Sequence, residues 1–115
     1  MRESIGARIR SVRTSRGVDR KTLAEMAGCT PQYLAEIESG GRDPSLSLLR
    51  RLALGLRVPA GELLGGVDGD QDRLEAYLAD VGNWSGDEAH SLKRDIEALV
   101  RLYQARQGGL RGTGD

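Results

Sequence analysis

Apolar residues along the first 64 positions recur at helical spacing in five short blocks, each bounded by residues that start or stop helices. In the first block Ile5, Ile9 and Val12 are spaced i, i+4 and i+7, which predicts a helix over residues 4–16. The later blocks predict helices at about 20–27, 31–39 and 45–56, and one short helical turn within 57–66. None of these helices would be stable alone at such a length, so we expect all five to pack into one domain over residues 1–66.

A second apolar pattern follows the Gly- and Asp-rich stretch at 67–71, which its composition predicts to be a linker. A pair of helices is predicted over residues 72–107, and a glycine-rich, disordered tail over 108–115. Along the second helix of the pair the apolar residues step by three and four, as in a heptad seam. This seam packs within one subunit or pairs with a second copy, and we expect it to do both. The predicted dimer interface consists of Trp84, Leu92, Ile96, Leu99 and Tyr103.

The composition favours an all-α protein with an aliphatic core. The 115 residues include no Phe, so the core must be built from Leu, Ile, Val and Ala. The single Cys cannot form an internal disulfide, and no apolar run approaches the ~20 residues needed to span a bilayer. The N-terminus is charged and lacks the apolar segment of a secretory signal. We therefore expect a cytoplasmic protein that does not enter a membrane.

The charge divides between the two halves of the chain although it sums to zero. Residues 1–66 carry 11 basic and 7 acidic residues, a net charge of +4, while residues 67–115 carry 6 basic and 10 acidic residues, a net charge of −4. Such asymmetry indicates two separate functions, one of which involves binding a polyanion. Alternatively, it reflects chance scatter of charge on two solvated surfaces.

The predicted helices at 20–27 and 31–39 are joined by a tight turn, Gly28-Cys29-Thr30. Two short helices joined by three or four residues that include Gly are typical of the helix-turn-helix unit. In that unit the second helix enters the DNA major groove by its N-terminal end. Its helices cross steeply and need small residues where they meet, and Ala24, Ala27 and Gly28 meet that need.

The segment around this predicted helix-turn-helix unit is similar to a known protein family. Residues 5–64 resemble the xenobiotic-response-element family of helix-turn-helix regulators, which includes the phage Cro and lambda-type repressors. The matching segments are "LAEMAG", "YLAEIESG", "DPSLSLLRRLA" and "LRVPAGELL", in the family's order. The resemblance implies an all-α fold in which a five-helix lambda-repressor-like domain precedes a C-terminal two-helix dimerisation segment.

The resemblance also implies which residues contact double-stranded DNA. Gln32, Tyr33 and Glu36 would face base edges from the third helix, where Gln favours adenine and Glu accepts from cytosine. Contacts to the phosphate backbone would come from the remaining candidates, Arg20, Thr30, Arg42 and Ser45. Arg13 and Glu38 match a structural salt bridge of the family. These implications predict a transcriptional regulator, most simply a repressor that binds a pseudo-palindromic operator as a homodimer.

Two features depart from the family pattern. Many relatives carry Lys or Arg where Gly41 stands, and the third helix contains Glu36 and Glu38 but no basic residue. A carboxylate facing a polyanion weakens binding, because phosphate neutralisation supplies much of the affinity. The alternative is therefore an antitoxin-type interaction module, whose acidic C-terminal half would grip a partner protein.

The remaining candidate residues give little support to catalysis or to metal binding. Cys29 occupies a position where the family has a small apolar residue, so we expect a buried hydrophobe there rather than a redox switch. His90 has no second His or Cys partner in the sequence. Asp68, Asp70 and Asp72 are out of register with a calcium loop. We expect no enzyme activity, no metal and no cofactor.

Overall fold

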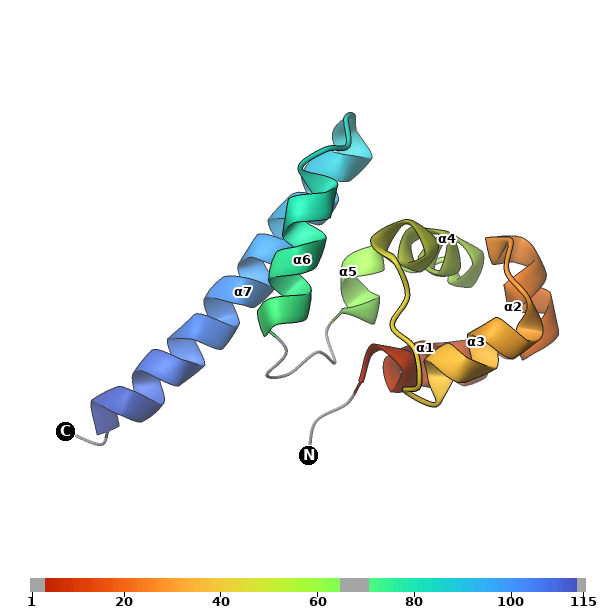
Figure 1. The fold of residues 1–115 in the computed structure, drawn as a ribbon, viewed down its shortest axis with the longest axis horizontal. Coiled ribbons are helices and arrows are strands. Elements are labelled where there is room, and N and C mark those ends of the chain that lie inside the picture. Colours follow the sequence, from red (N-terminus) through yellow and green to blue (C-terminus); the bar gives the residue numbers. More distant parts are fainter. Residues whose placement is uncertain (1–3, 65–70, 114–115) are drawn as a thin grey trace. The chain divides into compact units, whose positions relative to one another are not determined.

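The computed structural model describes residues 4–64 and 71–113, and within these ranges all regular secondary structure is helical (Figure 1). The chain divides into two compact units, Met1–Val67 and Asp68–Asp115. The first unit contains α1 (Ile5–Ser15), α2 (Arg20–Ala27), α3 (Pro31–Glu38), α4 (Leu46–Leu56) and α5 (Ala60–Leu63). The second unit contains α6 (Gln71–Val81) and α7 (Asp87–Thr113). The predicted all-α class and the five helices of the first unit are thus confirmed.

Side-chain caps begin the first four helices, as the sequence leads one to expect. The Ser4 hydroxyl accepts a hydrogen bond from Ala7 N at 3.0 Å, and the Asp19 carboxylate accepts one from Thr22 N at 2.7 Å. The corresponding caps of α3 and α4 are the hydroxyls of Thr30 and Ser45. Each cap satisfies a backbone N–H group that has no partner within its helix, and so fixes where the helix begins.

The core of the first unit is aliphatic. Its fully buried large side chains are Ile9, Leu23, Leu34, Ile37, Leu46, Leu49, Leu52, Leu56, Leu63 and Leu64. Helix α1 approaches α3 closely at Gly6, where a Cβ atom would lie 1.7 Å from the carbonyl oxygen of Ile37. Only glycine fits at that point, because any side chain would overlap the backbone of α3. This contact places α3 firmly on the core and leaves its opposite side exposed.

In the second unit α6 and α7 run antiparallel side by side, joined by a short turn (Figure 1). Their shared core contains Leu74, Tyr77 and Val81 from α6, and Ala89, Leu92, Ile96 and Val100 from α7. The predicted antiparallel packing of this helical pair within one subunit is therefore present in the structure.

The far end of α7 differs from the prediction. The helix continues to Thr113, whereas the sequence predicted that it ends at 107 and that a disordered tail occupies 108–115. Gly108 and Gly109 each lower helix stability by about 1 kcal/mol relative to Ala, but they keep their N–H groups and do not interrupt the hydrogen-bond ladder as Pro would. At the other boundary α6 begins at Gln71, one residue before the predicted start, and the rest of the predicted linker lies outside the described residues.

Candidate nucleic-acid interface

Helices α2 and α3 form the turn that the sequence predicts. Gly28 adopts a left-handed conformation with φ 73° and ψ 33°, and Cys29 N donates to Ala24 O at 3.0 Å. This closes α2 with a glycine C-cap, and Thr30 then opens α3. Because only two residues separate the glycine from Pro31, α3 starts abruptly, with its first N–H groups unpaired by the helix itself.

A buried ion cluster holds α3 against α1. Arg13 Nε donates to Glu38 Oε2 at 2.7 Å and Arg13 Nη2 donates to Glu38 Oε1 at 3.1 Å, a bidentate pair. The third nitrogen, Nη1, donates to Val18 O at 3.0 Å in the α1–α2 turn. The side chains of Arg13 and Glu38 are 9% and 2% exposed. The pairing implied by the family resemblance is therefore present, and it joins three segments of the fold.

Arg20 belongs to the same cluster. Its Nε and Nη2 both donate to Glu38 Oε1 at 3.2 Å, although its side chain is 40% exposed. The sequence predicted a phosphate contact for Arg20 and did not predict this bond. The hydrogen bond to Glu38 raises the pKa of Arg13 further above its ordinary value and so favours the charged guanidinium. Two arginines thus neutralise one of the two carboxylates of α3.

The second carboxylate of α3 is paired as well. Arg42 Nε donates to Glu36 Oε2 at 3.1 Å, and its guanidinium carbon lies 5.2 Å from the centre of the Tyr33 ring. The two charged side chains are 56% and 46% exposed. Arg42, Tyr33 and Glu36, three of the predicted DNA-binding residues, therefore form one surface cluster. The absence of a basic residue within α3 is offset by a cation that the following loop supplies.

The other predicted contact residues are exposed. Gln32 lies one turn before Glu36 on α3, at a spacing of four that places both on one face of the helix. Thr30 and Ser45 are exposed and serve as N-caps, accepting from Tyr33 N at 3.0 Å and from Leu48 N at 3.1 Å. A capping hydroxyl keeps its own proton and can donate it to a phosphate oxygen.

Two features near the turn were not predicted from the sequence. Arg51 donates from Nε to Ala27 O at 2.8 Å, and so caps the C-terminal end of α2. Cys29 is half-buried rather than fully buried, and burial raises the pKa of its thiol. A raised thiol pKa lowers the thiolate fraction and with it the reactivity of Cys29.

The predicted dimer-interface residues separate into two groups in the structure. Leu92 and Ile96 are buried within the α6–α7 pair, at 4% and 0% exposure, so they are core residues of one subunit rather than a surface for a second copy. Their assignment to a subunit contact needs correction, because α6 already covers the seam. Leu99 and Trp84 are half-buried, and nearby Leu102 is 53% exposed. The side chain of Tyr103 lies outside the described part of the structure.

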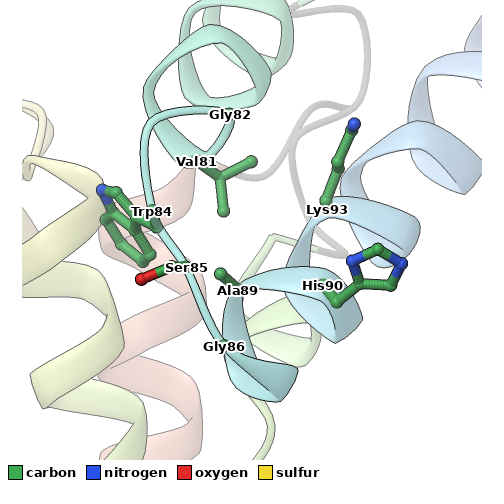
Figure 2. Close-up of a pocket in the computed structure, with 8 residues that line it drawn as sticks. All are labelled: Val81, Gly82, Trp84, Ser85, Gly86, Ala89, His90 and Lys93. Atoms are coloured by element: carbon green, nitrogen blue, oxygen red, sulfur yellow. The ribbon is translucent and has the colours of Figure 1, made fainter.

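A surface pocket of about 250 Å³ lies where α6 ends and α7 begins (Figure 2). Val81 and Ala89 point into the space between the two helix ends, and His90 and Lys93 border it along α7. Trp84 lies on the turn beside them and remains partly accessible. No group of three His, Cys, Asp or Glu side chains that could hold a metal ion occurs in residues 4–64 or among the described part of 71–113.

None of the described helices is both long enough and apolar enough to cross a membrane.

Comparison with known proteins, like the geometry of α2 and α3, indicates a helix-turn-helix protein. A family model described as helix-turn-helix matches residues 9–63. The chain is 43% identical over 55 residues to an uncharacterized HTH-type transcriptional regulator, Rv0474, of Mycobacterium tuberculosis, covering 48% of this chain and 39% of that protein. It is 38% identical over 78 residues to the HTH-type transcriptional regulator DdrOP3 of Deinococcus deserti, and the match covers 64% of this chain and 60% of that protein. It is 36% identical over 62 residues to the immunity repressor protein of Bacillus phage phi105, and the match covers 54% of this chain and 43% of that protein.

The chain thus spans 39–60% of the length of these curated relatives. Among solved structures it is similar to the restriction-modification controller protein C.AhdI from Aeromonas hydrophila, at 36% identity and a TM-score of 0.50. That similarity covers 51% of this chain and 89% of C.AhdI. The chain belongs to the helix-turn-helix family of the Cro and lambda-type repressors.

Proposed function

We propose that this protein is a sequence-specific DNA-binding transcriptional regulator that represses by occupying an operator. The observation that carries the proposal is the exposed side of α3. It presents Gln32, Tyr33 and Glu36 beside Arg42, while Arg13 and Glu38 clamp the opposite side of the helix to the core. A short helix held rigidly on one side, with polar side chains on the other, suits insertion into the major groove. Such a function requires no catalytic group.

A selection experiment tests this function directly. Duplex DNA with a randomised segment is selected with the intact protein, and binding to the enriched sequence is measured by fluorescence anisotropy over a salt series. We expect log K to fall linearly with log salt concentration, as phosphate contacts demand. Replacing Gln32 and Tyr33 with Ala should reduce sequence preference more than nonspecific binding. Equal loss of both would show that these side chains do not read bases.

We further propose that two copies bind one pseudo-palindrome, with their α3 helices about 34 Å apart. Support comes from the apolar side chains of the second unit that one subunit leaves accessible, namely Trp84, Leu99 and Leu102. Leu102→Glu places a charge on the accessible side of α7 near Leu99 and should shift the sedimentation mass towards the monomer while leaving the helix content unchanged. Gln104→Glu, an exposed change on the same helix, is the matched control. A dimer that survives Leu102→Glu would refute this location of the interface.

The antitoxin-type alternative has less support than the regulator. It was favoured by two carboxylates on α3 with no basic residue within that helix, and both carboxylates have arginine partners from other segments, which weakens that argument. A protein that bound a heteromeric partner stably but retained no DNA at low salt would revive it.

A further inference from the structure

Glu36 and Arg42 lie side by side, and each retains part of its hydrogen-bonding capacity. Their contact uses one atom from each side chain, Glu36 Oε2 and Arg42 Nε, at 3.1 Å. Among the described residues, no other side-chain hydrogen bond involves Glu36 Oε1 or the two terminal nitrogens of Arg42. The pair therefore presents one free acceptor oxygen next to two free donor nitrogens.

The backbone after α3 makes this arrangement. Gly41 N and Ser39 Oγ both donate to the carbonyl oxygen of Glu36 at 3.0 Å, so the loop folds back over the last turn of the helix. This return brings Arg42 alongside a residue six positions earlier in the chain. The Tyr33 ring, 5.2 Å from the guanidinium carbon, supports Arg42 from a second direction. A guanidinium held by two contacts keeps a more defined orientation than a free surface arginine.

The pattern of acceptor and donors matches one base pair best. In the major groove a C·G pair presents the cytosine N4 amino donor next to two guanine acceptors, O6 and N7. Arginine commonly binds both guanine acceptors at once, and glutamate accepts from cytosine N4. An A·T pair offers single acceptors on either side of its donor and adds the apolar thymine methyl group, so it leaves part of the pair unsatisfied.

Resting on the proposed DNA-binding function, we propose that Glu36 and Arg42 act as one reader of a single C·G base pair, with Glu36 on cytosine and Arg42 on guanine. Their mutual contact also removes the repulsion that a lone carboxylate would meet at the DNA surface. Arg42 then specifies sequence, instead of serving as the phosphate contact that the family resemblance implied.

The test compares variants on the selected operator, with each position changed in turn to all four base pairs. In the wild type one C·G pair should lose about 5- to 150-fold in affinity when replaced, the usual range for a specified base pair. Arg42→Ala and Glu36→Ala should each abolish most of that preference at this same position, and the double variant should lose no more than either single one. Glu36→Gln should shift the preference there towards A·T, because an amide binds adenine in preference to cytosine.

Arg10→Ala is the matched control, because it removes one exposed cation from α1 without touching the pair. It should lower affinity for all sequences alike. If Arg42→Ala behaves like this control, Arg42 binds phosphate and the composite reader is refuted, while the proposed function stands. Loss of preference at two different base pairs for Glu36 and Arg42 would refute it too. If the wild type selects no sequence at all, the proposed function itself fails.

Discussion

Replacing Arg13 with Ala should destabilise the first unit far more than replacing Arg20, although both arginines bind the same carboxylate. Arg13 makes a bidentate bond to Glu38 at 2.7 and 3.1 Å, and both side chains are less than a tenth exposed. Arg20 binds from the surface, where 40% of its side chain is exposed to solvent. Water screens the Arg20 interaction and would replace much of it.

The magnitude follows from these burials. Removing one partner of a buried pair costs about 3–5 kcal/mol, because the other charge stays buried without full compensation. Arg20 still binds Glu38 in Arg13→Ala, so we expect the lower end of this range, about 3 kcal/mol. Arg20→Ala should cost about 1 kcal/mol or less. For a unit of this size these values correspond to a fall in Tm of about 12–24 °C and of less than about 8 °C.

Urea and thermal unfolding followed by far-UV circular dichroism measure both values, and Trp84 fluorescence follows the second unit separately. The double variant Arg13→Met, Glu38→Leu serves as a control and should be more stable than Arg13→Ala, because replacing both charges leaves none buried alone. Equal destabilisation by Arg13→Ala and Arg20→Ala would refute the argument from burial. A wild-type Tm combined with weaker DNA binding in Arg13→Ala would show that Arg13 acts on DNA instead of on the fold.

Three further substitutions have expected outcomes. Gly6→Ala should prevent the first unit from folding normally, as judged by circular dichroism, because its Cβ would lie 1.7 Å from the carbonyl oxygen of Ile37. Gly41→Lys should strengthen DNA binding several-fold and steepen the plot of log K against log salt by about one, with Gly41→Ala as the neutral control; its Cβ meets no atom closer than 3.6 Å. Asp19 has a pKa lowered by its hydrogen bond from a backbone N–H, so the stability it confers is complete above its ordinary pKa of 3.8 and is lost as the pH falls through the lower folded pKa. In Asp19→Asn this part of the acid dependence of Tm should disappear. If Tm fell with decreasing pH as it does in the wild type, the Asp19 carboxylate would not be the group responsible.

Local signals were sufficient to predict the first unit. Ser, Asp and Thr residues mark the helix starts, Gly28 marks the end of α2, and the apolar spacing identifies the buried faces. Each of these signals acts within one turn of helix, so no tertiary information is needed to interpret it. The same holds for the identity of the exposed residues on α3.

The contacts of Arg42 and Arg51 could not be predicted in this way. Arg42 reaches Glu36 only because the loop folds back at Gly41, and Arg51 reaches Ala27 only because α4 packs beside α2. Such contacts depend on where helices and loops lie in space, and the spacing of charges along the chain does not predict them. The heptad pattern of α7 predicted the packing against α6 that the structure contains, but it does not tell a covering helix in the same subunit from one in a second copy, so pairing between two subunits stays a prediction.

The pairing of every carboxylate on α3 has a consequence for affinity. With Glu38 bound to two arginines and Glu36 bound to Arg42, the helix neither repels DNA nor adds attraction of its own. The proposed Glu36–Arg42 pair therefore discriminates between base pairs and adds little to overall affinity. Attraction to the phosphates must come from the remaining cations of the first unit, each of which contributes a small share. Joining two such units raises the effective concentration of the second at its half-site to roughly millimolar, which strengthens weak binding by about 10²- to 10⁴-fold without new contacts. Dimer disruption by Leu102→Glu should therefore reduce operator affinity more than Arg42→Ala does, yet leave the preference for C·G unchanged.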